Sequence, residues 1–406
     1  MSFGIDISKI DRFEKYLDDK KFLNRILTEE ELKIYSTKGE RGKLEFLSGR
    51  FSSKEALSKA LGTGIGQISF KDIEILNLDS GKPIISLKGR ALKKWNEKFL
   101  KDPLVSISHD GNYVVTLVIG KKKDLGVSKT MDLNPPFPLM ERKREGHKGT
   151  FGRVGILGGS KGMLGSIYLS SMAALKTGSG LVYSGVPREI FDLMQIKSTE
   201  NIVREMDWNK ESCFTEFSKD LDALGLGPGM GKSLSLKNLK GIFQSYNGPI
   251  ILDADGINLL SQDMDLLKYA KNVVLTPHPG EFSRLLGKPI DIIEKNRWEL
   301  SKEFAKKYSI ILILKGHNTI VTDGLRIYEN KTGTSGLGTA GSGDVLTGIL
   351  TSLMGQGYSL YEGCCLGVYI HGLCGNFLEE SIGSDGIIAS DIFNEIPYVI
   401  KALRER

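Results

Sequence analysis

Apolar residues beyond position 146 form short, strongly hydrophobic runs that alternate with helical spacing. Six runs are typical of buried strands, at 154–157, 181–186, 223–226, 249–252, 273–275 and 310–314. Several of them end directly in loops of Gly, Pro or Asp. Strands that alternate with helices form open, mostly parallel sheets, whose sites lie at the carboxyl ends of the strands. We therefore predict a three-layer α/β domain.

The first 120 residues mix the two periods instead. A helical pattern covers 51–61, and strand patterns cover 68–75, 84–87 and 113–119. Turn residues at 79–83 separate the strand patterns at 68–75 and 84–87. The pattern predicts a small α+β domain.

A polar, proline-rich stretch separates the two parts. It begins with three lysines at 121–123 and contains the sequence N-P-P-F-P at 134–138. Charge runs and clustered prolines build no core and favour extended linkers. The predicted organisation is a domain over 1–120, a linker over 121–145 and a domain over 146–406.

The bulk composition limits the class of protein. The chain has 406 residues, of which 40% are hydrophobic and 26% charged, which indicates a globular protein of two or three domains. No apolar run approaches the ~20 residues of a membrane-spanning helix, so we expect no membrane association. The polar amino terminus does not fit a signal peptide. The four cysteines form no C-x-x-C pair, so we expect reduced thiols and a cytoplasmic location.

Positive charge is concentrated in the first third of the chain. Residues 1–130 hold 25 Lys and Arg against 18 Asp and Glu, a net charge of +7, while the whole chain carries +6. Such a surface suits an acidic partner or a phosphorylated ligand, although a solvated lysine-rich surface explains it too. Neither a stripe of aromatic and basic residues nor zinc-finger spacing supports nucleic-acid binding.

The segment 339–344 carries the strongest sign of chemistry. It reads T-A-G-S-G-D and precedes apolar residues at helical spacing. Gly341 and Gly343 leave backbone N–H groups accessible at a helix N-terminus, where anions are favoured. Asp344 adds a carboxylate that can accept a proton from a group about to meet a phosphate. Taken alone, an ordinary capping Asp after a glycine turn explains the segment equally well.

Other strand-end loops strengthen the functional interpretation. The loop K-G-H-N-T at 315–319 offers a cation and a hydroxyl for phosphates, and P-H-P-G-E at 277–281 holds a histidine in a stiff turn. The loop L-G-P-G at 226–229 allows close backbone approach. Each loop alone is weak evidence, but their order along the chain predicts one phosphate-binding crevice.

Six segments of the second part resemble the nucleotide-dependent NAD(P)H-hydrate dehydratases, which have a ribokinase-like fold. They are H-K-G-T-F-G-R-V-G-I-L-G-G-S (147–160), G-L-G-P-G-M-G (225–231), I-L-D-A-D-G-I-N-L-L (251–260), L-T-P-H-P-G-E-F (275–282), L-K-G-H-N-T (314–319) and G-T-A-G-S-G-D-V-L-T-G (338–348). The resemblance implies that ADP or ATP phosphorylates the hydroxyl of hydrated NADH or NADPH (NADHX or NADPHX), and that loss of phosphate restores the cofactor. The epimerase domain that usually accompanies this family is not recognisable.

The resemblance also implies roles for individual residues. Asp344 would accept the hydroxyl proton, and the N–H groups of Gly341 and Gly343 would stabilise the transferring phosphoryl. The nucleotide would be held by Lys315, Gly316, His317, Asn318, Thr319, Gly341 and Gly343. The hydrate pocket would be lined by Ser166, Gly229 and His278, with Ser166 standing where many relatives carry alanine.

Two carboxylates stand out in the first part. Asp6 lies between apolar residues of a short strand, where a charge is costly unless it is paired or bound to metal. Glu55 and Lys59 share a helix face at i and i+4, most simply as a surface ion pair. Two carboxylates and a lysine also suit Mg²⁺ on a pyrophosphate. His109 stands immediately before the last strand.

Four segments here resemble the holo-[acyl-carrier-protein] synthases, which are 4′-phosphopantetheinyl transferases. They are G-I-D-I (4–7), R-F-S-S-K-E-A-L-S-K-A-L-G-T-G-I (50–65), D-S-G-K-P (79–83) and S-I-S-H-D (106–110). The resemblance implies that coenzyme A donates phosphopantetheine to a serine of acyl carrier protein. Relatives are trimers with sites between subunits, so we expect a homo-oligomer.

This second resemblance assigns roles as well. Asp6 and Glu55 would bind Mg²⁺, while Lys59 and His109 would contact phosphates or assist proton transfer. Coenzyme A would contact Lys59, Gly62, Gly64, Lys82 and Pro83. Arg12, Lys15, Lys20 and Lys21 are candidates for the carrier-protein docking surface.

Two other interpretations remain open at this point. The second domain could be a vitamin or sugar kinase, which leaves a stable phosphate ester instead of releasing phosphate. Alternatively, one domain could be a ligand-binding module without activity. The presence of Asp6, Glu55, Lys59, His109 and Asp344 argues against loss of activity.

Overall fold

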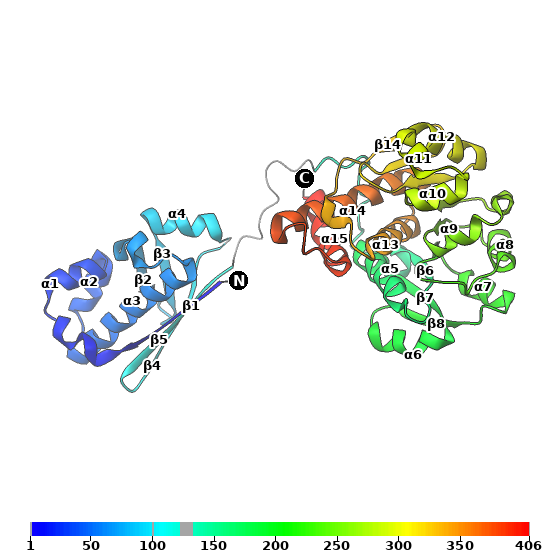
Figure 1. Ribbon diagram of the computed structural model, residues 1–406. Coiled ribbons are helices and arrows are strands. Elements are labelled where there is room, and N and C mark those ends of the chain that lie inside the picture. Colours follow the sequence, from blue (N-terminus) through cyan, green and yellow to red (C-terminus); the bar gives the residue numbers. More distant parts are fainter. Residues whose placement is uncertain (1, 100, 122–132, 406) are drawn as a thin grey trace. The chain divides into compact units, whose positions relative to one another are not determined.

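The computed structural model describes residues 2–99, 101–121 and 133–405. Its contacts divide the chain into two compact units, Met1–Lys129 and Thr130–Arg406, and each is described here by itself (Figure 1). Residues 122–132 of the predicted linker lie outside the described residues. Within the described part of the chain, no helix is long and apolar enough to cross a membrane.

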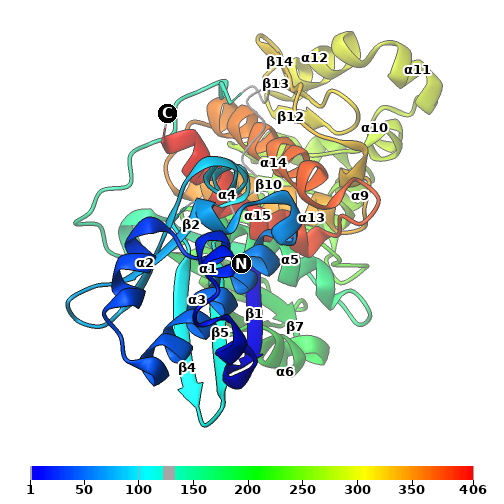
Figure 2. The ribbon, with the colours of Figure 1, turned by 90° about the vertical axis from the view of Figure 1, so that its left-hand side faces the viewer.

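The first unit is built on a three-stranded antiparallel sheet. Its strands are β1 (Ser2–Lys9), β5 (Tyr113–Gly120) and β4 (Leu104–Asp110), in that order. Helix α3 (Glu40–Leu61) packs along β1 and β5 (Figure 2). A Cβ on Gly4 would lie 1.9 Å from the carbonyl oxygen of Ala56, so only glycine allows this close approach. Further elements of this unit are α1 (Lys20–Ile26), α2 (Glu29–Ser36), α4 (Gly89–Lys98) and the hairpin of β2 (Ile73–Asn77) and β3 (Pro83–Leu87).

Two predicted elements of this unit have different bounds. The helix predicted over 51–61 in fact begins at Glu40. The prediction missed its first half because that half carries few apolar residues. The strand predicted over 68–75 begins at Ile73, since the preceding Phe70–Asp72 forms a 3-10 turn capped by the Ser69 hydroxyl. The predicted α+β class is confirmed.

The second unit contains a nine-stranded sheet of order β14-β13-β12-β11-β10-β9-β6-β7-β8. Strands β6 to β12 are all parallel to one another, while β13 and β14 pair antiparallel at one edge of the sheet. The strands are β6 (Arg153–Leu157), β7 (Leu181–Pro187), β8 (Ile202–Met206), β9 (Ala223–Leu226), β10 (Ile250–Leu252), β11 (Val273–Leu275), β12 (Ile311–Leu314), β13 (Ile320–Thr322) and β14 (Ile327–Glu329). All six predicted strands are present. The three that the pattern missed are the edge strands β8 and β14 and the neighbouring β13, which are short or carry charged residues.

Helices cover both faces of this sheet, as the predicted three-layer arrangement requires. One face packs against α5 (Leu164–Thr177), α13 (Ser342–Gly355) and α14 (Leu360–Ile382), and α15 (Ala389–Arg404) packs on these three helices. The other face packs against α8 (Leu236–Ser245), α9 (Asp255–Leu260), α10 (Pro279–Leu286) and α12 (Arg297–Tyr308). The other α-helices described in this unit are α6 (Arg188–Lys197), α7 (Glu211–Ser218) and α11 (Ile290–Lys295). The ribokinase-like class is confirmed.

The described part of the predicted linker lies against this second unit. Leu139 packs on the hydrophobic core under α13 and α14, and the ring of Phe137 meets Tyr361 edge-on. The backbone N–H of Met140 donates a hydrogen bond to the Tyr358 hydroxyl at 2.7 Å. Residues 133–145 are therefore held by apolar contacts that the proline content did not suggest.

Candidate active sites

The segment 339–344 forms the N-terminus of α13. Gly341 is the capping residue with φ of 86°, a left-handed conformation that favours glycine. Asp344 lies in the first turn of the helix. A Cβ on Gly343 would lie 3.3 Å from Lys315 Nζ, so this glycine brings the helix end close to a cation.

A buried cluster of charges lies beside this helix end. Lys315 Nζ donates a hydrogen bond to Asp253 Oδ1 at 2.7 Å and lies 4.0 Å from Glu281 Oε2. Thr276 donates to the same Asp253 oxygen at 2.8 Å, and Thr347 donates to the other at 2.9 Å. These residues follow β10, β11 and β12 or belong to α10 and α13, so the cluster forms at the carboxyl ends of the strands.

The cluster changes the acidity of its members. Burial raises the pKa of Asp344 to about 6, and the negative charge of Asp253 adds to this effect, while a hydrogen bond from Ser166 and the charge of Lys315 act against it. Burial lowers the pKa of Lys315, but the carboxylates of Asp253 and Glu281 outweigh burial, so its pKa lies above the usual value. At neutral pH the site therefore holds a fixed cation next to a carboxylate that can accept a proton.

A cavity of about 850 Å³ opens beside the N-terminus of α13. Its lining includes all of the 315–319 loop together with Gly343, which are six of the seven residues predicted to bind a nucleotide. Gly341, the seventh, is not part of this lining, and a Cβ there would lie 2.5 Å from Leu169 Cδ1 and 3.0 Å from Ala389 Cβ. The rest of the lining consists of residues 330–335, 337–339, Ser342, Leu346, Val368, His371, Gly372 and Glu379.

The predicted hydrate-binding residues lie outside this lining. Ser166 hydrogen-bonds with the Asp344 carboxyl, and a Cβ on Gly229 would lie 2.8 Å from Ser166 Cβ, so these three residues form one group. His278 is half-exposed and accepts a hydrogen bond from the Gly280 N–H on Nδ1 at 3.0 Å.

Asp253 and Glu281 were absent from the predicted site. Asp253 is 2% exposed and Glu281 is 4% exposed, yet both face Lys315. Asp253 directly follows a strand, and Glu281 lies at the start of a helix. These positions were the signals in the sequence that could have identified them as site residues. Ala254, which follows Asp253, has φ of 45°, a strained value for a residue with a Cβ, and it marks the same turn.

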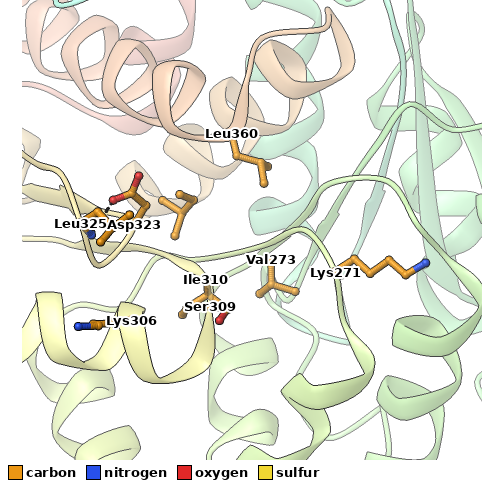
Figure 3. Close-up of a pocket in the computed structure, with 9 residues that line it drawn as sticks. Lys271, Val273, Lys306, Ser309, Ile310, Asp323, Leu325 and Leu360 are labelled. Carbon is orange, nitrogen blue, oxygen red and sulfur yellow. Dashed lines mark hydrogen bonds between the residues drawn. The ribbon is translucent and has the colours of Figure 1, made fainter.

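A smaller cavity of about 350 Å³ lies at the amino ends of the strands, opposite the carboxyl ends that carry the charge cluster. Figure 3 shows its lining, which includes Val273 and Ile310 at the amino ends of β11 and β12. None of the predicted site residues lines it. The candidate chemistry of this unit therefore lies at the carboxyl end of the sheet.

The first unit brings Asp6, Glu55 and Lys59 together between β1 and α3. Lys59 Nζ donates hydrogen bonds to Asp6 Oδ1 at 2.9 Å and to the carbonyl oxygen of Ile5 at 3.0 Å. The Ser8 hydroxyl donates to Asp6 Oδ2 at 2.9 Å. Burial raises the pKa of Asp6, but the hydrogen bonds from Lys59, Ser52 and Ser8 outweigh it, so the pKa lies below its usual value. Burial and the charge of Asp6 raise the pKa of Glu55.

This carboxylate pair suits Mg²⁺ better than a metal held by protein alone. No group of three or more His, Cys, Asp or Glu residues that could hold a metal occurs in residues 2–99, 101–121 and 133–405. Mg²⁺ is typically bound through one or two carboxylates and takes its other ligands from phosphate and water. The mutual repulsion of Asp6 and Glu55 is what a bound cation would relieve.

His109 does not join this group within one chain. Its Nε2 lies 3.3 Å from the carbonyl oxygen of Glu45 and 3.5 Å from the position of a Cβ on Gly49, which is six residues before Glu55 on α3, or about 9 Å along a helix. Gly62 and Gly64 follow the end of α3 with φ of 68° and 65°, and Cβ atoms there would meet open space. The predicted coenzyme A residues Lys82 and Pro83 lie at the start of β3, where Lys82 is exposed.

The outward face of the three-stranded sheet is apolar and exposed. Side chains alternate along β1, so Asp6 and Ser8 face α3 while Phe3, Ile5 and Ile7 face away. These three side chains are 58%, 54% and 62% exposed. Leu104, Tyr113 and Val115 of the neighbouring strands are exposed as well.

Comparison with known families agrees with this division. Residues 154–398 match the NAD(P)H-hydrate dehydratase family, and residues 2–118 match the 4′-phosphopantetheinyl transferase superfamily. Both predicted family relationships are confirmed.

Individual relatives match the second unit. The bifunctional NAD(P)H-hydrate repair enzyme of Moorella thermoacetica is 37% identical over 66% of this chain and 52% of that protein. The ADP-dependent (S)-NAD(P)H-hydrate dehydratase of Neisseria meningitidis is 35% identical over 63% of this chain and 88% of that protein. The chain thus spans about half the length of the bifunctional repair enzymes that it matches.

A solved structure matches the same region. The ADP/ATP-dependent NAD(P)H-hydrate dehydratase of Bacillus subtilis, co-crystallized with ATP and Mg²⁺, has a TM-score of 0.58 at 27% identity. The match covers 67% of this chain and 100% of that one.

Proposed function

Since the chain belongs to the NAD(P)H-hydrate dehydratase family, we propose that its second unit uses ADP or ATP to dehydrate the S epimer of NADHX or NADPHX. The observation that carries this proposal is Asp344, a partly buried carboxylate with a pKa raised to about 6, at the N-terminus of α13. The helix end beside it opens on a cavity with Lys315, and nucleotide phosphates favour such a combination.

The proposed reaction has two steps. The hydroxyl oxygen of the hydrate attacks the terminal phosphorus of the nucleotide, the bond from that phosphorus to the bridging oxygen breaks, and Asp344 takes the hydroxyl proton. AMP leaves when ADP is the donor, and ADP leaves when ATP is the donor. The C–O bond of the phosphorylated hydrate then breaks, inorganic phosphate departs, and loss of a ring proton restores the dihydropyridine.

The neighbouring residues suit this sequence. The N–H groups of Gly341 and Gly343 and the cation of Lys315 would stabilise the charge of the transferring phosphoryl. His317, Asn318 and Thr319 lie in the same loop and would hold the rest of the nucleotide. Ser166, Gly229 and His278 would line the hydrate pocket on the other side of Asp344.

The fate of the phosphoryl group tests this proposal against a kinase. Purified protein is incubated with hydrated cofactor and ADP or ATP, and restored dihydropyridine absorbance and inorganic phosphate are measured together. We expect one phosphate for each restored cofactor. A phosphate ester that accumulates, with no return of absorbance, would favour the small-molecule kinase. Failure with both nucleotides would contradict the proposal.

We also propose that the first unit transfers 4′-phosphopantetheine from coenzyme A to a serine of acyl carrier protein. The serine oxygen attacks the β-phosphorus of coenzyme A, and adenosine 3′,5′-bisphosphate leaves. Asp6 and Glu55 would hold Mg²⁺, which neutralises pyrophosphate charge when bound. Lys59, which donates a hydrogen bond to Asp6, would contact the same phosphates, while Gly62, Gly64, Lys82 and Pro83 would contact the nucleotide end.

The docking surface for the carrier protein would be basic. Arg12, Lys15, Lys20 and Lys21 are all exposed around α1. These four cations suit an acidic carrier protein. We expect the reaction to take place in the cytoplasm. Mass spectrometry of apo-acyl carrier protein after incubation with coenzyme A and Mg²⁺ tests this activity. The expected result is one phosphopantetheine adduct, and an unmodified carrier protein would contradict it.

The first unit would act as a homo-oligomer. The exposed face of Phe3, Ile5 and Ile7 is a continuous apolar surface, and such surfaces mark association sites. Association would also allow the His109 of one copy to approach the carboxylates of another. Sedimentation of the Ile5→Lys variant should show dissociation, while Leu78→Lys, a change on the β2–β3 turn, should not. An unchanged Ile5→Lys assembly would contradict this role.

A further inference from the structure

Ser342 lies between the two glycines of the α13 N-terminus and contacts a histidine from another helix. Its hydroxyl and its carbonyl oxygen each lie 3.1 Å from Nε2 of His371 on α14. Both residues line the 850 Å³ cavity, together with Lys315 and Gly343. Neither residue has a role in the reaction described above.

The contact determines how the two side chains share hydrogens. A carbonyl oxygen only accepts hydrogen bonds, so its contact with Nε2 favours the tautomer that carries the ring hydrogen on that atom. Burial lowers the pKa of His371 to about 4, so the ring is neutral at physiological pH. The Ser342 hydroxyl oxygen then accepts from Nε2–H, and its own hydrogen remains to be donated elsewhere.

The next residues of α14 fix this arrangement to the cavity wall. A Cβ on Gly372 would lie 2.2 Å from Thr332 Oγ1, so the glycine lets the 330–335 segment approach the helix. The Thr332 hydroxyl donates a hydrogen bond to the Tyr369 carbonyl oxygen at 3.0 Å. The same turn of α14 therefore supports one wall of the cavity and orients Ser342 on another.

We propose that Ser342 donates its hydroxyl hydrogen bond to the transferring phosphoryl of the nucleotide, and that His371 is the positioning residue that orients this hydroxyl. Phosphate oxygens only accept hydrogen bonds, so a hydroxyl whose oxygen already faces a donor presents its hydrogen to them. The inference rests on the proposed nucleotide-dependent repair and adds a side-chain donor to the backbone N–H groups of Gly341 and Gly343.

Calorimetric titration with ADP and AMP tests the role of Ser342. The Ser342→Ala variant should bind ADP about 10-fold more weakly, the usual effect of losing a hydrogen bond to a charged group. Its affinity for AMP should be unchanged, because AMP lacks the transferring phosphoryl. Ser245→Ala, an exposed change on α8 outside the cavity lining, is the matched control and should leave both affinities unchanged.

Substitution of His371 tests the positioning role. His371→Leu should weaken ADP binding about as much as Ser342→Ala, and the double variant should show little further loss, because both changes remove one interaction. His371→Gln should restore most of the affinity, since its side-chain amide offers an N–H donor near the position of Nε2. In kinetic assays, the nucleotide KM should rise about equally in Ser342→Ala and His371→Leu and less in His371→Gln. The KM for the hydrate should be unchanged in all three.

The outcomes separate this inference from the proposed function. Parental protein that neither binds ADP nor repairs the hydrate overturns the proposed function. Parental protein that does both, with unchanged ADP affinity in Ser342→Ala, overturns only the role of Ser342. Equal loss of ADP and AMP binding overturns the contact with the transferring phosphoryl. A His371→Gln variant as weak as His371→Leu overturns the positioning role.

Discussion

Asp6 and Asp344 are both aspartates close to a lysine, but their surroundings shift their acidity in opposite directions. Asp6 accepts hydrogen bonds from Lys59 and Ser8, which outweigh its burial and lower its pKa. Asp344 is partly buried near Asp253, whose own charge is already paired with Lys315, and its pKa rises to about 6. The first environment favours a permanent anion, and the second favours an acid that gains and loses a proton.

This difference teaches how one residue type supports two kinds of phosphate chemistry. A carboxylate that stays ionised is suited to holding a cation against a pyrophosphate. A carboxylate with a pKa near neutrality is suited to general base catalysis. The hydrogen-bond donors around each carboxylate, more than its position in a motif, separate the two proposed roles.

Replacement of the proposed base should have the largest effect. Asp344→Asn keeps the shape of the side chain but cannot accept the hydroxyl proton, so we expect hydrate repair to fall by about 10³-fold or more. The rate of dihydropyridine recovery under saturating nucleotide measures the change. Repair near the parental rate would show that Asp344 is not the base.

The buried ion pair of the first unit should give the next largest effect. Lys54 and Glu31 are both fully buried and 2.6 Å apart, so Lys54→Met leaves a carboxylate without its cation. We expect a loss of about 3 kcal/mol in the free energy of unfolding. Lys33→Met, which removes the exposed pair with Glu30, should cost less than about 1 kcal/mol.

Tryptophan fluorescence can follow this unit separately. Trp95 belongs to the first unit, whereas Trp208 and Trp298 belong to the second. With Trp208 and Trp298 replaced by Phe, denaturant unfolding reports Trp95 alone. Equal midpoints for the Lys54→Met and Lys33→Met variants would contradict the importance of the buried pair.

Loss of a proposed metal ligand should reduce carrier-protein modification by the first unit. Glu55→Gln removes one of two carboxylates, so we expect carrier-protein modification to fall by about 10²-fold. The fraction of modified carrier protein is measured by mass spectrometry across a Mg²⁺ titration. Glu45→Gln, on the same helix, is the control. Parental activity and an unchanged Mg²⁺ dependence in Glu55→Gln would exclude it as a ligand.

The pH dependence of repair should show a smaller, graded effect. The raised pKa means that Asp344 is protonated below about pH 6 and cannot accept a proton there. We expect kcat/KM to be constant above this pH and to fall about tenfold for each unit below it. A profile that stays flat well below pH 6, in protein shown to remain folded, would contradict the assignment.

The sequence predicted the local features of both sites and missed their long-range contacts. Asp344 and the 315–319 loop were identifiable because glycines, a strand end and a helix start lie together in the chain. Asp253 pairs with Lys315 across 62 positions, and no local pattern shows which strand ends become neighbours. The distance between His109 and Glu55 was equally hidden, since it depends on strand register and on the length of α3.

The same limit applies to the fold. Buried strands such as β9 and β12 were evident from their apolar runs, while β13 has only three residues and pairs antiparallel at the sheet edge. Prolines suggested an extended linker through residue 145, but Phe137 and Leu139 pack on the second unit. Composition describes what a segment favours alone and not which surface covers it.

The central claim is that the chain holds two separate phosphate-handling sites with different uses for their carboxylates. Asp344→Asn and Glu55→Gln, prepared side by side, can each be assayed for hydrate repair and for carrier-protein modification. We predict that Asp344→Asn loses repair and keeps carrier-protein modification, and that Glu55→Gln shows the reverse. A comparable loss of both activities in either variant would contradict the separation.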